Sequence, residues 1–358
     1  MDENDKFLEI AIKEALKGGV FVRPNPMVGC VIVKNGKILA SGYHKVFGGP
    51  HAEVNAIRKL DSKKLKNSSM YVTLEPCSTY GKTPPCTDLI IKSGIKKVVI
   101  GSIDPNPLHR GRGADILRKN KITVEFGSKE IEKKCEDINS YFFKNMKEKM
   151  PYVVLKLAGS LDGKIANGKY LSKWISSEKS RLYAHKLRAE SDLIIVGSNT
   201  VLKDNPYLNV RDIKTRKQPS VCVIDLKLKT CQKSNIFSIK DRKVFVISDK
   251  TKDLGKNVEF IKPIFKNNEL DLKKILKRFY DLGIRTVLVE GGGITVANFV
   301  KQNLFDKIYW FVSPIIIGAD GISSIGLPLE LKNGEIGMRL KIKKVSKLDC
   351  DILMELER

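Results

Sequence analysis

Several features that mark secreted and membrane proteins are missing from this sequence. Its apolar runs all fall short of the roughly 18 residues that a membrane-spanning helix requires. The opening residues, Met1 to Asp5, are acidic, whereas a secretory signal begins with positive charge. Cysteine is sparse, and its seven residues are scattered without the spacing of a disulfide framework. We therefore expect a cytoplasmic protein in a reducing compartment.

Acidic residues are in short supply relative to basic ones, and the net charge is +25. The excess is spread along the chain, with 27 basic against 17 acidic residues in 1–150 and 38 against 23 in 151–358. There is no basic tail and no Arg-rich patch with interleaved aromatic residues. This even spread argues against a nucleic-acid partner, and a phosphorylated small molecule would benefit from the positive field.

The length of 358 residues exceeds what one hydrophobic core normally serves, so two domains are expected. The charged stretch 144–149 is followed by Met150-Pro151, and a helix does not run comfortably through a proline. We predict domains at 1–149 and 150–358.

Strands and helices alternate through the first domain, which predicts a mostly parallel sheet covered on both faces. Asn35-Gly36 is a strong signal for a tight hairpin turn. The pattern predicts strands at 30–33, 38–40, 70–74, 97–102 and 122–126, and helices at 6–17, 52–60, 86–92, 114–119 and 131–147.

One imidazole, two thiols and one carboxylate in this domain have the spacing of a catalytic zinc site. His51, Cys77 and Cys86 would be the three protein ligands, and Glu53 would handle protons beside them. Taken singly, such residues are more often buried cysteines and a satisfied histidine. His-x-Glu followed by Pro-Cys after an apolar strand, with a second cysteine opening a helix, favours the metal.

This arrangement resembles the signature of the zinc deaminases, in which the metal acidifies a water that then displaces ammonia from a heterocycle. Nucleic-acid deaminases have P-C-x-x-C, whereas the loop from Cys77 to Cys86 is longer here. The longer loop predicts a different substrate for the same chemistry.

The second domain is also predicted to alternate strands and helices. Glu290-Gly291-Gly292-Gly293 closes an apolar strand and precedes a helix, where backbone N–H groups can approach a phosphate. The motif lacks the third glycine of the dinucleotide fingerprint, since Val296 stands there, and by itself it is equally compatible with an ordinary turn. Residues 227–270 are rich in lysine and carry no specific signal.

Motifs along nearly the whole chain resemble the bifunctional deaminase/reductase family of riboflavin biosynthesis. The first half carries Asn25-Pro26, His51-Ala52-Glu53, Leu74-Glu75-Pro76-Cys77-Ser78, Gly81-Lys82-Thr83-Pro84-Pro85-Cys86 and Asp104-Pro105-Asn106-Pro107. The second half carries the segments 156–163, 173–175, 187–189, 197–201, 204–206 and 289–292. The resemblance implies an α/β protein with a cytidine-deaminase-like three-layer domain followed by a dihydrofolate-reductase-like domain.

The resemblance also assigns residues to roles. In the first half it implies substrate contacts from Asn25, His44, Lys82, Asp104 and Asn106, and Thr79 stands where the family often has histidine. In the second half it implies substrate contacts from Ser172, Arg188, Leu208, Arg211 and Glu290. Cofactor contacts are implied for Ala158, Trp174, Thr200, Asp204, Gly292, Gly293, Ile294, Thr295, Val296, Ala297 and Asn298.

The function implied by this resemblance is a two-step conversion in one polypeptide. One zinc ion would support hydrolytic deamination of 2,5-diamino-6-(5-phosphoribosylamino)pyrimidin-4-one, and NADPH would then reduce the ribosyl group to ribityl. The expected partner is this phosphorylated pyrimidine, and no membrane is expected to bind. The sequence does not decide whether the protein forms a homo-oligomer. Two alternatives are a zinc-dependent nucleic-acid base deaminase with an accessory domain and a zinc-stabilised RNA-binding protein without catalysis.

Overall fold

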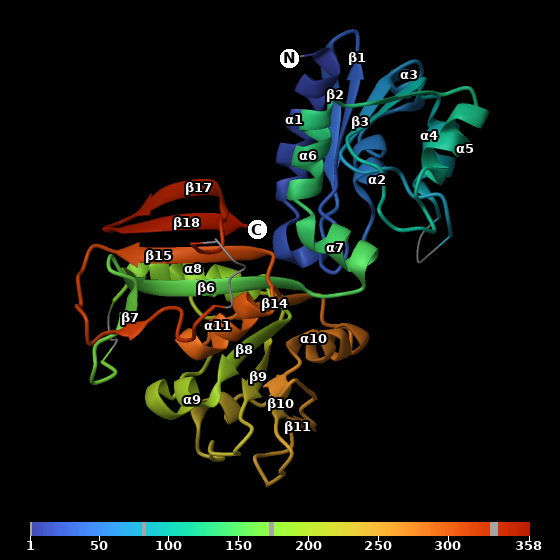
Figure 1. Ribbon diagram of the computed structural model, residues 1–358. Helices are drawn as coiled ribbons and strands as arrows, with labels where there is room; N and C mark the ends of the chain where they lie inside the picture. Colours follow the sequence, from blue (N-terminus) through green and yellow to red (C-terminus); the bar gives the residue numbers. More distant parts are fainter. Residues whose placement is uncertain (1, 81–83, 172–174, 330–335) are drawn as a thin grey trace. The chain divides into compact units, whose positions relative to one another are not determined.

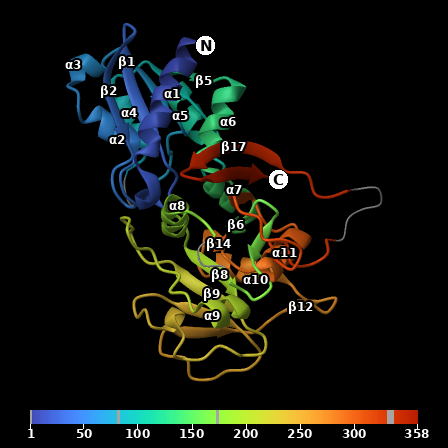
Figure 2. The same cartoon turned by 90° about the vertical axis from the view of Figure 1, so that its left-hand side faces the viewer.

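The protein is described here by a computed structural model covering residues 2–80, 84–171, 175–329 and 336–358. The chain divides into two compact units, Met1–Lys149 and Met150–Arg358. Each unit has its own sheet flanked by helices (Figures 1 and 2). Among the described residues, no helix combines the length and the apolar character needed to cross a membrane.

The sheet of the first unit has the strand order β2-β1-β3-β4-β5. Its strands are β1 (Gly29–Lys34), β2 (Lys37–Tyr43), β3 (Ser69–Val72), β4 (Lys97–Ile100) and β5 (Thr123–Phe126). Strands β3, β4 and β5 are parallel, but β1 is antiparallel to both β2 and β3. The hairpin predicted at Asn35-Gly36 is present, and both residues adopt the left-handed conformation of a tight turn. The prediction of a mostly parallel sheet holds for β3, β4 and β5 but was wrong for β1, which is antiparallel to β3.

Helices cover both faces of this sheet, as predicted (Figure 1). Side chains alternate along β1: Val31 and Val33 join the cluster of α1 (Glu3–Leu16) and α6 (Lys129–Asp137), while Cys30 and Ile32 join the opposite cluster. That opposite cluster contains residues of α2 (Ala52–Ile57), α4 (Cys86–Ser93) and α5 (Arg112–Lys119). The shorter elements are η1 (Gly19–Val22) and α3 (Ser62–Leu65).

The long helix predicted over 131–147 is two helices, α6 (Lys129–Asp137) and α7 (Ser140–Glu148). Asn139 separates them with φ −122° and ψ 23°, which are not helical values. Its side chain bonds to the backbone of Met27, far away in the sequence. Periodicity alone misses such a break, because apolar residues continue on both sides of it.

The sheet of the second unit has the order β11-β10-β9-β8-β14-β6-β15-β18-β17. The first seven strands in this order are parallel to one another. The pairs β15–β18 and β17–β18 are antiparallel. The strands are β6 (Tyr152–Ser160), β8 (Leu193–Gly197), β9 (Ser220–Ile224), β10 (Val244–Ile247), β11 (Val258–Ile261), β14 (Thr286–Val289), β15 (Lys307–Ser313), β17 (Lys341–Leu348) and β18 (Asp351–Glu357).

Two buried clusters lie on opposite faces of this sheet. One includes residues of α8 (Glu178–Ala189) and α9 (Ser198–Asp204), and the other includes residues of α10 (Leu272–Asp281) and α11 (Gly293–Lys301). The remaining short elements are β7 (Lys164–Ala166), η2 (Asn235–Phe237), β12 (Phe265–Lys266), β13 (Glu269–Leu270) and β16 (Ile322–Ser323). Helix α9 begins directly after the carboxyl end of β8, and α11 begins after a short turn at the carboxyl end of β14. Open parallel sheets place their ligands at such strand ends.

Candidate active sites

His51, Cys77 and Cys86 meet in the first unit although they come from three separate elements. His51 precedes α2, Cys77 follows β3, and Cys86 is the first residue of α4. Their ligand atoms all lie within 4.8 Å of one another. The Cys86 N–H donates to the Cys77 sulfur at 3.3 Å, and the Thr87 N–H donates to the Cys77 carbonyl. These two bonds hold Cys77 next to the start of α4.

The separations fit a zinc ion. Tetrahedral zinc with Zn–N bonds of about 2.0 Å and Zn–S bonds of about 2.3 Å holds its nitrogen and sulfur ligands about 3.5 Å apart. His51 Nδ1 lies 3.3 Å from the Cys86 sulfur and 3.6 Å from the Cys77 sulfur. Among the described residues this group has one imidazole, two thiols and no fourth protein ligand, which is the donor set of a catalytic rather than a structural zinc.

The charge state of Cys77 also suits a metal. Hydrogen bonds from Cys86 and His51 lower the pKa of the Cys77 thiol to about 4. The hydrogen bond to Cys77 raises the pKa of His51 to about 9, and the Cys86 thiol, which shares its proton with Cys77, has its pKa raised. Cys77 is therefore a thiolate, which is the form that binds zinc.

Glu53 lies beside the ligands on α2 and is 3% exposed. Its Oε2 atom is buried and has no hydrogen-bond partner among the described residues. Burial raises the pKa of the carboxyl, while the neighbouring His51 pulls that pKa downward. A buried carboxylate with one oxygen left open beside a metal site is equipped to accept and return a proton.

Asn25 and His44 form a pair next to His51. The His44 ring lies edge-on to the His51 ring, with centroids 5.5 Å apart. Its Nδ1 is 3.0 Å from the Pro50 carbonyl, so this nitrogen carries the hydrogen, and Nε2 accepts from the Asn25 amide at 3.3 Å. Burial lowers the pKa of His44, which keeps the ring neutral and in one tautomer.

Asp104 and Asn106 lie on the loop between β4 and α5. Asp104 is 7% exposed, accepts from the Asn106 N–H at 2.8 Å, and has its pKa raised by burial. Asn106 in turn accepts from the Leu108 N–H. The loop is held by Glu75, whose carboxylate accepts from the N–H groups of Asp104, Gly111 and Ala114.

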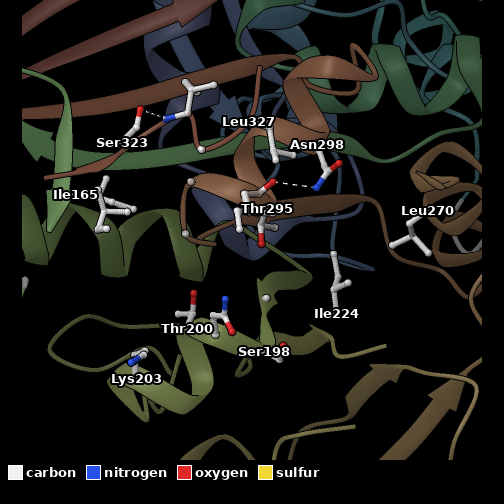
Figure 3. A pocket seen from close by; sticks show the side chains of 18 of the residues that line it. Ile165, Ser198, Thr200, Lys203, Ile224, Leu270, Thr295, Asn298, Ser323 and Leu327 are labelled. Atoms are coloured by element: carbon white, nitrogen blue, oxygen red, sulfur yellow. Dashed lines mark hydrogen bonds between the residues drawn. The ribbon is translucent and has the colours of Figure 1, made fainter. Parts of the chain in front are cut away.

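The second unit contains a cavity of about 1180 Å³ between the start of α9 and the start of α11. Figure 3 shows Thr200 and Lys203 on one wall and Thr295 and Asn298 on the opposite wall. Lys203 is the only basic side chain among the described residues that line it. Thr200, Asp204, Gly292, Gly293, Ile294, Thr295 and Asn298, all expected to contact a cofactor, line this cavity.

Three other expected cofactor contacts do not line the cavity. Val296 and Ala297 are fully buried on the core side of α11, because only part of a helix can face a cavity. Ala158 packs on the sheet face that α8 covers. Trp174, Ser172 and Lys82 lie outside the described residues.

A buried group of charges lies where α8 approaches the end of β14. Arg188 grips Glu290 with two hydrogen bonds of 2.6 and 2.8 Å. Burial raises the pKa of Glu290, but the attraction of Arg188 outweighs it and the pKa lies below its ordinary value. Lys156 on β6 is close enough to feel both charges, and burial lowers the pKa of its amine.

The segment with Leu208 and Arg211 is fastened to this group through its backbone. Arg188 donates to the Asn209 carbonyl at 3.2 Å, and the buried Arg242 donates to the Leu208 carbonyl at 2.9 Å. Leu208 has φ 50°, a left-handed value uncommon for leucine. The Arg211 N–H lies 3.4 Å from His185, and its side chain is exposed.

Comparison with known proteins accounts for both units. Residues 151–354 match the family described as the RibD C-terminal domain, and residues 1–102 match the cytidine and deoxycytidylate deaminase zinc-binding region. The riboflavin biosynthesis protein RibD of Aquifex aeolicus is 40% identical, covering 100% of this chain and 99% of that protein. The Escherichia coli RibD is 33% identical over 99% of both chains.

The chain belongs to the RibD family.

Solved RibD structures agree with this assignment. The Acinetobacter baumannii RibD structure is 34% identical with a TM-score of 0.87, covering 99% of this chain and 98% of that one. A Thermotoga maritima structure, titled as a diaminohydroxyphosphoribosylaminopyrimidine deaminase/5-amino-6-(5-phosphoribosylamino)uracil reductase, is 36% identical with the same TM-score and coverage.

Membership in the RibD family makes this chain a bifunctional deaminase and reductase of riboflavin biosynthesis. The predicted fold class, a cytidine-deaminase-like unit followed by a dihydrofolate-reductase-like unit, is confirmed. The RibD match over the second half also disfavours the base deaminase and the RNA-binding protein, because neither accounts for it.

The sequence did not assign roles to several residues that shape these RibD sites. Lys156 stands in a strand between the buried Leu155 and Leu157, and a lysine in such a strand is itself a signal. Glu75 belongs to the motif Leu74-Glu75-Pro76-Cys77-Ser78, but the sequence did not predict that its carboxylate holds the loop of Asp104. Asn139 and Arg242 carry no local signal, because their partners are distant in the sequence.

Proposed function

We propose that the first unit deaminates 2,5-diamino-6-(5-phosphoribosylamino)pyrimidin-4-one with one zinc ion, and that the second reduces the ribosyl side chain with NADPH. The proposal divides the two activities at residue 149. The observation that carries it is the meeting of His51, Cys77 and Cys86 within 4.8 Å, beside the open oxygen of Glu53. The name of the Thermotoga maritima relative supports the substrate.

In the first reaction, His51 and the two cysteines would hold the metal, leaving a fourth position open. Zinc, when bound there, acidifies water and so supplies a nucleophile at neutral pH. Glu53 Oε2 would accept a proton from the attacking water and donate it to the departing amine. Its burial suits this exchange, because a raised pKa brings the carboxyl closer to the pH at which it works.

The pyrimidine would be oriented by groups with fixed hydrogen-bonding roles. The neutral His44 ring and the Asn25 amide are hydrogen-bonded to each other, so both side chains would meet a substrate in a fixed orientation. Asp104 and Asn106 would contact the ribose phosphate region from the loop that Glu75 holds. Lys82 would add a positive charge for the phosphate.

In the second reaction, NADPH would occupy the cavity between α9 and α11. The cofactor, when bound, supplies the hydride. Gly292 caps α11, and its nearest neighbour to an added Cβ is 3.8 Å away, so a phosphate can approach this helix start closely. Lys203 would balance negative charge from the opposite wall.

The substrate of the reductase would lie against Arg188 and Glu290. Their paired charges fix the end of β14, and Lys156 with its lowered pKa can lend a proton near neutral pH more readily than an ordinary lysine. Arg211, from the adjoining segment, would meet the phosphate with its forked guanidinium. Ser172, Leu208, Ala158 and Trp174 remain proposed contacts.

The test uses the whole chain with the diaminopyrimidine, with and without NADPH. Ammonia release is expected without NADPH, and NADPH oxidation only after deamination or when the deaminated compound is supplied. Glu53→Gln should lose ammonia release by roughly 10²-fold or more while keeping its zinc and its reductase activity. A Glu53→Gln chain that deaminates normally would contradict the assignment of Glu53, and a wild-type chain inactive on this pyrimidine would contradict the substrate.

A further inference from the structure

Helices α6 and α7, which lie between the two matched families, have no assigned role. The zinc-binding region ends at residue 102 and the RibD C-terminal domain begins at residue 151. Between them lie α5, β5, α6 and α7. His51, Cys77, Cys86 and Glu53 all precede this stretch, so it contributes none of the side chains of the proposed metal site.

Asn139, at the break between α6 and α7, makes two side-chain hydrogen bonds to the backbone of the segment that carries Asn25. Its Oδ1 accepts from the Met27 N–H at 2.8 Å, and its Nδ2 donates to the Met27 carbonyl at 2.8 Å. The side chain is 1% exposed. One amide therefore satisfies both backbone groups of a single residue, as a neighbouring strand would, and water does not compete for these bonds.

Tyr141 holds the same segment two residues upstream. Its buried hydroxyl donates to the Asn25 carbonyl at 2.6 Å, and the Arg23 guanidinium lies 4.4 Å from the centre of its ring. Asn139 and Tyr141 thus fasten the backbone on both sides of Pro26.

This segment carries the Asn25 amide, which contacts His44, and the His44 ring lies edge-on to the ring of His51. Asn25 Nδ2 donates to His44 Nε2, and the backbone N–H of His44 donates to the Val28 carbonyl at 3.0 Å. The backbone of Asn25 therefore has Tyr141 on one side while its side chain points to His44. An uncontrolled shift of this backbone would move the Asn25 amide, and an error of 1 Å in a positioning group can lower activity a hundredfold.

We propose that Asn139 and Tyr141 are positioning residues for the deamination: they hold residues 23–28 so that Asn25 and His44 meet the pyrimidine in one geometry. The inference rests on the proposed function, in which Asn25 and His44 contact that substrate. It also assigns a role to α7 and to the break before it, which lie outside both matched families: they hold a segment of the zinc-binding region in place.

The test compares Asn139→Ala and Tyr141→Phe with wild type in the full-length chain. Asn139→Ala removes both bonds to Met27, and Tyr141→Phe removes one bond while keeping the ring beside Arg23. KM for the pyrimidine should rise roughly thirtyfold in Asn139→Ala and roughly fivefold in Tyr141→Phe, the fold-changes that correspond to the loss of two bonds and of one bond at about 1 kcal/mol each. Zinc content should stay at one per chain, and kcat should change less than KM.

A matched control lies in the second unit. Gln218 grips Val210 as Asn139 grips Met27, with its Oε1 accepting from the Val210 N–H at 2.7 Å and its Nε2 donating to the Val210 carbonyl at 2.9 Å. Gln218→Ala should leave the KM of deamination unchanged. Reduction of the deaminated compound should in turn be unchanged in Asn139→Ala, which reports that the rest of the chain is folded.

Hydrogen–deuterium exchange of residues 23–29 supplies a readout that needs no substrate. Faster exchange there in Asn139→Ala, with α1 unchanged, supports the inference. Unchanged exchange, or an unchanged KM in both variants, overturns it. A zinc loss that lowers kcat at constant KM also overturns it, since that would be a role in metal assembly. A wild-type chain that never releases ammonia refutes the proposed function instead, and the exchange data still judge the fastening.

Discussion

Replacing Arg188 by methionine should destabilise the second unit strongly. The Arg188 and Glu290 side chains are 16% and 6% exposed, and their two hydrogen bonds measure 2.6 and 2.8 Å. Removing one partner of such a buried pair costs about 3–5 kcal/mol, because the other charge stays buried. Lys156 also attracts Glu290 and compensates in part, so we expect a loss near 3 kcal/mol.

The assay is thermal unfolding of the full-length chain. For a unit of this size, 1 kcal/mol corresponds to roughly 2–4 °C, so the transition of the second unit should fall by about 6–12 °C. The first unit is the internal control, and its zinc content should not change. Arg188→Met combined with Glu290→Gln should recover at least half of the loss, because neither guanidinium nor carboxylate is then left alone.

The pH dependence gives an independent check with a defined sign. In the intact protein, Arg188 outweighs burial and holds the pKa of Glu290 below its ordinary value, so the stabilisation from this carboxylate is present at neutral pH and lost in acid. Without Arg188, burial dominates and raises that pKa. Protonation then relieves the penalty, so the deficit of Arg188→Met should shrink as the pH falls from 8 toward 5.

Two results would refute this reasoning. A transition lowered by less than 2 °C at pH 8 would mean that Glu290 is not held by Arg188 as described. A deficit that grows toward acid would mean that the carboxylate is stabilised by other groups, with Lys156 and His185 the nearest candidates.

Two further predictions concern backbone geometry. Gly293→Ala should destabilise the second unit and weaken NADPH binding, because an added Cβ would lie 2.3 Å from the Ser323 carbonyl, whereas Gly292→Ala should fold normally, its Cβ having no neighbour nearer than 3.8 Å. Thermal unfolding and NADPH titration of both variants check this, and equal stability of the two would contradict it. Glu75→Ala leaves three N–H groups without their acceptor and should destabilise the first unit by about 3 kcal/mol while raising the KM of deamination. An unchanged melting transition would show that water replaces the carboxylate.

Much of the fold was predictable because the periodicity of apolar residues reports burial directly. The hairpin at Asn35-Gly36 and the helix 86–92 were predicted from local sequence and are present. The metal ligands were predictable for a different reason: few other functions require His-x-Glu and two cysteines in this context. The helix 131–147 was predicted as one element and is two, because Asn139 bonds to Met27 instead of continuing the helix.

Other elements could not be obtained from local patterns. Helix α9, strand β11 and the hairpin β17–β18 were not predicted. Strand β17 has four lysines and mostly exposed residues, so it lacks the apolar alternation that identifies a strand, and its partner β18 defines it through backbone hydrogen bonds.

The sequence by itself determined the two-unit plan and the chemical types at the metal site, because composition, periodicity and residue type are local properties. Only the tertiary structure decided which groups act together: that Oε2 of Glu53 is left open, that Arg188 grips Glu290, and that Asn139 fastens Met27. The last two contacts join residues about a hundred positions apart in the sequence. The pKa of a charged group and the orientation of an amide depend on the neighbours that folding brings to it.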